Sequence, residues 1–348
     1  MKRNSTKLMA LIMLIAFTAA MTLTGCGNVS SVVEGESSEE PLTLIIANVM
    51  STGNNVTIGV EKFAELVEEK SDGKITVDVH SDAELGNDVD TTQQVQSGSI
   101  DLCTTSSDNY GVFDPEVLAL SLPYIVEKDK MDALYEAMDH GELGDYYRAR
   151  FAERNLHPVC FFEYGLRCFV SANDPIANPK DMNAMKLRAT SSKVELACAE
   201  ALGSPAQTVP WGDTYTALQQ GTVDGESNTF GLLHAAKHDE VLKYAVESEH
   251  NYSMHILMMA EDKYQALTDE QKRVIDEAAA EAVAFEREYS VKDELNAKKA
   301  FKEKGVKIEK LTPEQKEEWK EATKAVYDKL VPNVISQEVV DLIRATQK

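Results

Sequence analysis

Between residues 163 and 230 the chain reads, in order, EYGLR at 163–167, MKLR at 185–188, LGSP at 202–205, VPWGDTYTALQQG at 209–221 and VDGESN at 223–228. The run at 185–188 is typical of a short strand, and residues 193–202 have the apolar spacing of a helix that ends at Gly203. The stretch therefore predicts strands and helices in alternation.

Upstream of this stretch, the apolar residues continue the same alternation. A compact apolar run at 42–49 indicates a buried strand, and residues 56–70 have helical spacing. Alternation at 75–79 predicts a second strand, a helix follows at 89–96, and a short strand is expected at 100–104. This order predicts a parallel or mixed sheet that is covered by helices and connected by right-handed crossovers.

Two further strands are expected at 159–162 and 168–170, and a long helix is expected nearer the C-terminus. Neither Gly nor Pro occurs from residue 269 to about 304, which predicts a helix of roughly 35 residues and on the order of 50 Å. Capping boxes begin at Thr268 and Thr312, each with a glutamine three residues later. Because the helix is too long for one small domain, we expect two lobes to share it.

The composition is that of a globular protein with two domains. The chain has 348 residues, of which 43% are hydrophobic and 27% are charged, and its formal net charge is -23. Such an acidic chain without a basic patch argues against nucleic acid as a partner. The same charge repels an anionic ligand, so binding an acid would require specific buried cations.

The N-terminus predicts an export signal. Basic residues precede a mostly apolar stretch at 8–23, and LTGC at 23–26 resembles a bacterial lipobox. We therefore expect residues 1–25 to be a lipoprotein signal peptide, Cys26 to carry the lipid, and residues 26–41 to be a flexible tether. The alternative is an uncleaved membrane anchor, and either reading places the remaining chain outside the cytoplasm, at a cell surface or in a periplasm.

Motifs of catalysis, cofactors and metals are not found in the sequence. There is no GxGxxG after a strand, no phosphate-binding loop, no HExxH and no GxSxG. His234 and His238 share a helical face without a third ligand, so we expect a solvated face rather than a metal site. The four remaining cysteines form no CxxC pair, and buried free thiols are favoured over disulfides: Cys103, Cys160, Cys168 and Cys198. We predict a protein that is not an enzyme and has neither cofactor nor metal.

The motifs at 163–228 closely resemble the substrate-binding component of tripartite ATP-independent periplasmic (TRAP) transporters, the DctP-type family. Residues 83–88 (AELGND), 95–101 (VQSGSID) and 122–124 (LPY) fit the same family in the same order. The similarity covers essentially all of residues 42–348. Several ordered motifs make the resemblance specific, whereas each motif alone would be weak.

The resemblance implies a two-lobed α/β fold of the type II-like periplasmic-binding-protein kind, with hinge strands and a long helix that spans the lobes. Lobe I would comprise residues 42–164 plus about 254–293, and lobe II residues 165–253 plus about 294–348. The family also implies a monomer whose partners are a small carboxylate ligand and the membrane permease subunits.

The resemblance further implies the ligand-binding residues. Arg188 would pair with the ligand carboxylate, because a guanidinium offers a bidentate fork that stays charged when buried. Arg167 would add a second cationic contact, Asn228 an amide and Trp211 an aromatic face. From the other lobe, a looser alignment suggests Asn48, Asp88, Ser106 and Asn109. The alternatives are a structural ion pair for Arg188, a hinge salt bridge for Arg167 and a plain core position for Trp211.

The ligand class is narrowed by where the chain departs from the family pattern. After VDG the residues are ESNT, which retains Asn228 but changes its neighbours. Ser106 and Asn109 are neutral where sialic-acid-binding members carry charge, so sialic acid is disfavoured. We expect a sugar acid such as a uronate, or a C4-dicarboxylate, with a keto acid also open. A ligand-sensing protein of a signalling system is the alternative function, and a secreted enzyme on this fold lacks visible catalytic groups.

Overall fold

A computed structural model describes residues 41–348, and these residues form one compact unit. The predicted signal peptide, Cys26 and almost all of the predicted tether lie outside the described residues. Among the residues that are described, no helix is both long enough and apolar enough to cross a membrane.

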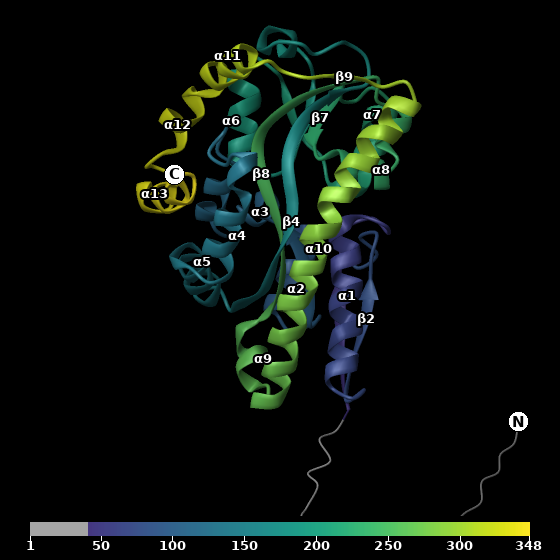
Figure 1. The fold of residues 1–348 in the computed structure, drawn as a ribbon, viewed down its shortest axis with the longest axis vertical. Coiled ribbons are helices and arrows are strands. Elements are labelled where there is room, and N and C mark those ends of the chain that lie inside the picture. Colours follow the sequence, from purple (N-terminus) through teal and green to yellow (C-terminus); the bar gives the residue numbers. More distant parts are fainter. Residues whose placement is uncertain (1–40) are drawn as a thin grey trace, which may run out of the picture. The chain divides into compact units, whose positions relative to one another are not determined.

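One mixed sheet of nine strands organises the described chain (Figure 1). Its strands are β1 (Leu42–Ala47), β2 (Ile75–His80), β3 (Leu102–Ser106), β4 (Leu156–Ser171), β5 (Leu187–Ala189), β6 (Ala206–Thr208), β7 (Gly225–Asn228), β8 (Tyr244–Ala260) and β9 (Lys307–Glu309). The order is β2-β1-β3-β8-β4-β7-β5-β6, and β9 pairs with β8. The parallel group β2-β1-β3 and the group β7-β5-β6 therefore lie on either side of the antiparallel pair β8 and β4.

The strand β4 corrects one prediction. The sequence indicated two short strands at 159–162 and 168–170, but β4 is a single strand of 16 residues. Its pairing with β8 shifts register at three bulges, one of which lies between Glu163 and Gly165. The charged residues Glu163 and Arg167 interrupt the apolar pattern, and both are buried in the fold, where they have tertiary partners. The alternation of apolar and polar residues carries no information about such partners, so the sequence pattern indicated two strands where the fold has one.

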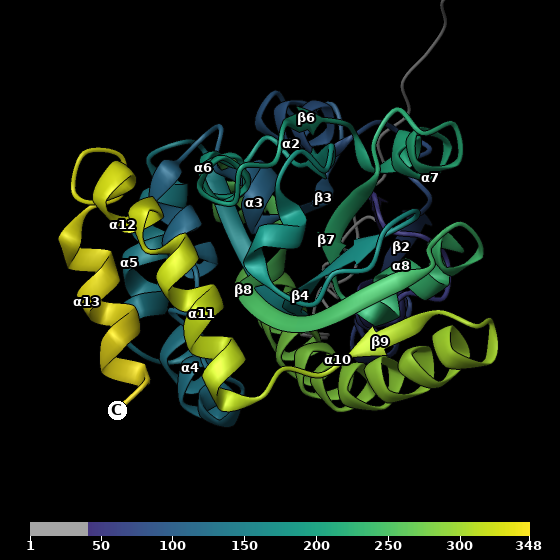
Figure 2. The same ribbon diagram turned by 90° about the horizontal axis from the view of Figure 1, so that it is seen from above.

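Helices cover both faces of the sheet. They are α1 (Asn55–Lys70), α2 (Asp88–Gln96), α3 (Ser107–Tyr110), α4 (Met131–Asp139), α5 (Glu142–Ala152), α6 (Lys193–Ala201), α7 (Trp211–Gln219), α8 (Phe230–Ala235), α9 (Glu261–Ala266), α10 (Asp269–Glu303), α11 (Pro313–Thr323), α12 (Ala325–Leu330) and α13 (Gln337–Thr346). Successive residues of β8 enter two separate cores, as the pleat of a strand requires. One core lies under α1, α8 and α10, and the other under α4, α5, α6 and α13, which Figure 2 shows on the other side of the sheet.

The long helix α10 confirms the expectation of a 35-residue helix. Both predicted capping boxes are formed, at Thr268 and at Thr312, with each glutamine side chain bonded back to the cap backbone. Along its length α10 packs against α1, β4 and α8, so it contacts elements from both halves of the sheet. The helix, together with β4 and β8, therefore connects the two halves.

Candidate ligand-binding site

Arg188 occupies the middle of β5 and is 4% exposed. Its Nε donates to the carbonyl of Val209 at 3.0 Å, and its guanidinium lies 5.8 Å from the centre of the Trp211 ring. Among residues 41–348, no carboxylate lies within 4 Å of the Arg188 guanidinium, and its two terminal nitrogens have no hydrogen-bond partner. Arg188 is thus a buried cation whose bidentate edge is not used by the described protein.

Arg167 on β4 is equally buried but fully engaged. Its Nη1 lies 2.8 Å from Asp108 Oδ2 and 2.6 Å from Glu195 Oε1, and its Nε and Nη2 donate to the carbonyl of Ser227. The contact with Glu195 is an ion pair whose geometry is not that of a hydrogen bond. Glu195 Oε1 therefore accepts no hydrogen bond from the described residues, although the distance is short. Arg167 therefore ties α3, β4 and α6 together instead of presenting a free fork.

The residues predicted from the other half of the sheet meet around the start of α3. Asp88 is buried, and its Oδ1 accepts from the backbone of Ser106 at 3.0 Å. Burial raises the pKa of Asp88, against hydrogen bonds from Ser106 and Asn109 and the charge of Arg188. Ser106 caps α3, and Asn109 Oδ1 accepts from Ser191 Oγ at 3.0 Å. Asn109 thus reaches from one half of the sheet to the other.

Asn48 and Asn228 have internal partners. The Asn48 amide donates to Thr57 at 2.8 Å and to Ser81 at 3.1 Å, and its oxygen accepts from Thr104 at 2.8 Å. Asn228 donates to Glu226 at 3.4 Å and accepts from the backbone of Thr229. Since neither side chain is more than 1% exposed, both fix the backbone around the site in this arrangement.

Sequence reasoning missed a buried pair beside Trp211. His238 Nδ1 forms a hydrogen bond of 2.5 Å with Glu226 Oε1. The His238 ring also stacks on Trp211, with ring centroids 4.7 Å apart. Burial alone would raise the pKa of Glu226, but the charges of His238 and Arg188 outweigh it and lower this pKa below its usual range. The expected solvated histidine face is therefore wrong for His238, which is 1% exposed, because the turn after α8 folds back over β7.

Asp108 and Glu195 were also missed. Asp108 accepts from Ser121, Ser253 and Arg167, which lie far from it in the sequence, so no local signal marks it. Glu195 follows Ser192 by three residues, the spacing of a capping box, and this pattern would have drawn attention to it. Its carboxylate accepts from the backbone of Thr190 at 2.8 Å and turns towards Arg167.

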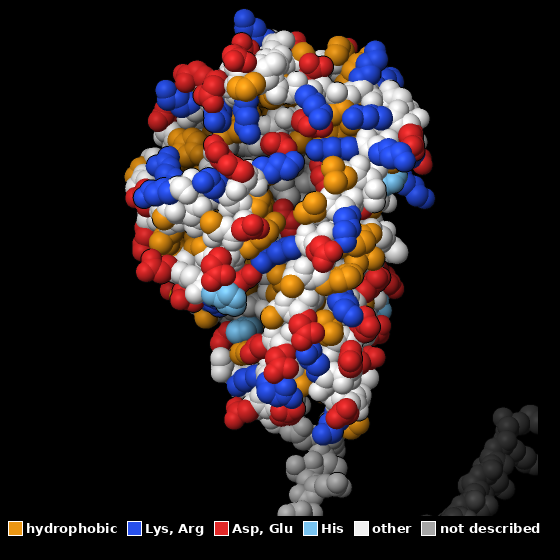
Figure 3. All heavy atoms as spheres, viewed as in Figure 1, with side chains coloured by type: hydrophobic (Ala, Val, Ile, Leu, Met, Phe, Trp, Pro, Cys, Tyr) orange, Lys and Arg blue, Asp and Glu red, His pale blue; other side chains and the backbone are white. Residues whose placement is uncertain are grey.

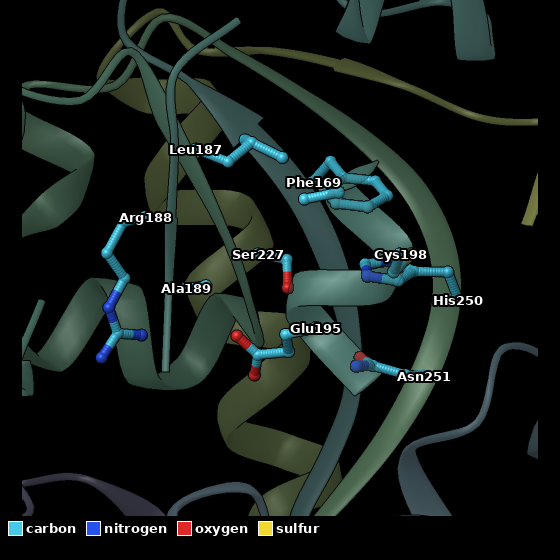
Figure 4. A pocket seen from close by; sticks show the side chains of 10 residues that line it. Phe169, Leu187, Arg188, Ala189, Glu195, Cys198, Ser227, His250 and Asn251 are labelled. Atoms are coloured by element: carbon cyan, nitrogen blue, oxygen red, sulfur yellow. The ribbon is translucent and has the colours of Figure 1, made fainter. Parts of the chain in front are cut away.

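A small cavity of about 20 Å³ lies beside Arg188 and Glu195, and of the ligand-binding residues that the sequence predicted only Arg188 lines it (Figure 4). It is lined by Phe169, Leu187, Arg188, Ala189, Glu195, Cys198, Ala199, Ser227, His250 and Asn251. Figure 4 shows Leu187 and Arg188, successive residues of β5, pointing in different directions. A volume of this size suits one water molecule. A larger ligand would therefore require the residues that line this cavity to move apart.

The cysteines and acidic side chains show no sign of a reactive or metal site. Within residues 41–348, no group of three His, Cys, Asp or Glu side chains could hold a metal ion. All four described cysteines are buried free thiols. Burial raises the pKa of Cys103, Cys168 and Cys198 to about 12, so these thiols stay protonated.

The profile of the bacterial extracellular solute-binding proteins, family 7 (DctP), matches residues 46–333. The chain belongs to this family. It is 28% identical over 311 residues to the C4-dicarboxylate-binding periplasmic protein DctP of Rhodobacter capsulatus, covering 88% of this chain and 92% of the relative.

Two solved structures of TRAP or sugar-acid binding proteins resemble this family 7 protein over 88% of its length. A TRAP periplasmic solute-binding protein of Sulfurospirillum deleyianum, with bound succinate, is 27% identical with a TM-score of 0.83, and all of that chain is covered. The sugar acid binding protein DctPAm of Advenella mimigardefordensis, in complex with galactonate, is 26% identical with a TM-score of 0.84, and 98% of that chain is covered. The protein therefore has the two-lobed α/β fold of TRAP solute-binding proteins, and its relatives are binding proteins rather than enzymes.

Proposed function

We propose that this protein captures a small organic acid outside the cytoplasm, holds its carboxylate against Arg188, and delivers it to the permease subunits of a TRAP transporter. The observation that carries the proposal is the buried guanidinium of Arg188, whose terminal nitrogens have no partner among residues 41–348. A buried charge without a partner is costly, and a bidentate carboxylate satisfies it. The relatives that bind succinate and galactonate support an acid as the ligand.

A sugar acid, such as a uronate or an aldonate, fits the site better than a C4-dicarboxylate. A dicarboxylate needs a second cation, and Arg167 is already engaged by Asp108 and Glu195. A further carboxylate beside these groups would be repelled. The hydroxyls of a sugar acid, in contrast, can bond to neutral or acidic groups such as Asn109 and Asp88, which lie near Arg188 in this fold.

The two lobes would close on the ligand by bending at their connections. We place lobe I at residues 42–164 plus about 254–293 and lobe II at residues 165–253 plus about 294–348. The bond between Asn109 and Ser191 then joins the lobes in the closed state. The segments that cross between them are β4, β8 and α10, and these would absorb the motion.

The N-terminal residues suggest how the protein stays near its permease. We propose that residues 1–25 are cleaved and that Cys26 carries the lipid, with the tether leading to β1. A tether of about 15 residues would keep the domain within several nanometres of the membrane. Mass spectrometry of the membrane fraction tests this, because the Cys26→Ser protein should lose the lipid mass and the membrane association.

Isothermal titration calorimetry with glucuronate, galactonate, succinate and neutral galactose tests the ligand. We expect binding of the sugar acids, weaker binding of succinate and none of galactose, with all binding lost in Arg188→Ala. Undiminished affinity in a folded Arg188→Ala protein would contradict the role of Arg188. Binding of galactose alone would contradict an acid as the ligand.

A further inference from the structure

A second cavity lies away from the Arg188 site, in a groove between α4, β4 and α10. It has a volume of about 580 Å³, within the range of about 300–1,000 Å³ that is usual for small-molecule sites. Its floor includes Leu166 and Cys168, whereas Arg167 between them does not line it. Figure 3, in the orientation of Figure 1, shows charged side chains of both signs around this region. We call it the hinge groove.

Glu163 forms the polar part of the floor of the hinge groove. It is 7% exposed, and its Oε2 accepts from Tyr135 at 2.6 Å and from Tyr252 at 2.9 Å. Among residues 41–348, no donor bonds to its other oxygen, Oε1, which is not sealed from the groove. A side chain at Gly165, whose φ is +111°, would place its Cβ 3.5 Å from this oxygen, so the glycine leaves it uncovered.

Glu163 and the neighbouring Glu286 are two buried carboxyl groups for which the structure shows no paired cation within 4 Å among residues 41–348. Glu286 on α10 is fully buried, accepts from the backbone of Glu163 at 2.9 Å, and has no cationic partner within 4 Å among the described residues. The nearest cation, Arg287, is held by Asp139 at 3.0 Å and stacks on Tyr135 at 4.0 Å. The other cations of the hinge groove are also paired: Lys128 with Glu249, and Lys298 with Glu247 and Glu294.

The remaining walls of the hinge groove are largely apolar. They include Met131 on α4, Leu166 on β4, and Ala284, Val291 and Leu295 on α10. Val291 and Leu295 are each 65% exposed, unusual for large apolar side chains, and face water beside the groove. An occupant would therefore bury apolar surface on α10 while it meets a carboxylate at the floor.

From this geometry we propose that the hinge groove is a second ligand site, which takes a small organic cation with a primary ammonium on an apolar stem. The ammonium donates to Glu163 Oε1, and the stem covers Leu166, Val291 and Leu295. This proposal does not rest on the proposed function, because none of these residues touches Arg188. The expected occupant is a free small molecule, whose size the groove matches.

Protonation of Glu163 gives the proposal a distinctive signature. Burial raises the pKa of Glu163 to about 7, against hydrogen bonds from Tyr135 and Tyr252 and the charge of Arg287, while Glu294 adds to the rise. Burial also raises the pKa of the adjacent Glu286 to about 8. An ammonium favours the ionised carboxylate, so its binding near neutral pH releases protons and strengthens as the pH rises through about 7.

Calorimetry of the whole protein with hexylamine and with 1-hexanol tests the site, at pH of about 6 and about 8 in two buffers of different ionisation enthalpy. We expect hexylamine to bind about tenfold or more tightly than hexanol at the higher pH, with proton release, because a charged hydrogen bond exceeds a neutral one. Glu163→Gln should remove that difference and the proton release. Glu281→Gln, on the same helix but outside the groove, with a side chain that is 56% exposed and paired with Lys70, should leave both unchanged.

Two results would overturn the proposal. One is equal or absent binding of hexylamine and hexanol by the wild-type protein. The other is unchanged preference for hexylamine in a Glu163→Gln protein that keeps its thermal transition. If Glu163→Gln does not fold, the wild-type protein decides the question, since heats of hexylamine binding that are equal in the two buffers would show that no proton is released and would overturn the proposal.

Discussion

Two buried arginines, on β4 and on β5, look alike in sequence and in burial but differ in their surroundings. Arg167 is 1% exposed and meets Asp108, Glu195 and the carbonyl of Ser227. Arg188 is 4% exposed and uses a single donor, to Val209. Burial of a cation therefore does not by itself indicate a ligand contact. A buried cation that no protein carboxylate neutralises is the one that an anionic ligand would stabilise.

We expect Arg167→Ala to destabilise the fold more than any other change considered below. Removing this guanidinium leaves Asp108 and Glu195 buried without their cation, which costs about 3–5 kcal/mol of unfolding free energy. Urea denaturation followed by circular dichroism measures this loss. Arg167→Lys should lose less unfolding free energy than Arg167→Ala. A loss below about 1 kcal/mol for Arg167→Ala would contradict a structural role for Arg167.

The next effect is on binding, from Arg188→Ala. Truncating one partner of a buried carboxylate pair costs about 2–5 kcal/mol of binding free energy, so we expect Kd for the organic acid to rise by at least about 30-fold. The same change should cost far less unfolding free energy than Arg167→Ala. Titration calorimetry and urea denaturation of both variants separate the two roles. If Arg167→Ala mainly weakened binding and Arg188→Ala mainly lowered stability, Arg167 would be the ligand contact and Arg188 the structural residue.

A third test uses the carboxylates beside the two arginines, whose pKa shifts have opposite directions. Burial raises the pKa of Glu195, against the charge of Arg167, while His238 and Arg188 lower that of Glu226 against burial. A raised pKa favours the fold at low pH, and this contribution is lost as the pH rises above about 4.5. A lowered pKa stabilises the fold above about 4.5, and this contribution is lost as the pH falls.

Glu195→Gln should therefore flatten the fall in stability above pH of about 4.5, and Glu226→Gln should flatten the fall below it. Each ionisation contributes at most about 1.4 kcal/mol per pH unit. Urea midpoints measured from pH of about 3.5 to about 7 test both variants. Parallel pH profiles for wild type, Glu195→Gln and Glu226→Gln would argue against different environments for the two carboxylates.

The smallest effect is expected from Asn109→Ala, which removes the bond to Ser191 between the halves of the sheet. A neutral hydrogen bond contributes about 0.5–1.5 kcal/mol, so ligand Kd should rise by about two- to tenfold. Because the bond would form only in the closed state, we expect most of the change in the dissociation rate measured by stopped flow. Ser191→Ala should have a smaller effect, since the backbone N–H of residue 191 still donates to Asn109 Oδ1 at 3.3 Å. An effect of Asn109→Ala as large as that of Arg188→Ala would contradict the dominance of Arg188.

Local patterns predicted the elements whose stabilising contacts are close in sequence. The helix α10 and the capping boxes at Thr268 and Thr312 depend on residues within a few positions of one another, and all three were predicted correctly. The continuity of β4 was missed because its interruptions, Glu163 and Arg167, are satisfied by residues from other elements. The environment of His238 was missed for the same reason.

The α/β order of elements, the long helix that both halves of the sheet share, and the motifs that place the chain in its family all follow from the amino-acid sequence. The matching of the buried charges, in contrast, depends on the tertiary fold. Asp108 and Arg167 are 59 residues apart, and Glu163 and Glu286 are 123 apart. Hydrophobic periodicity reports which face of a helix or strand is buried, whereas the partner of a buried charge depends on which distant segments the fold brings together.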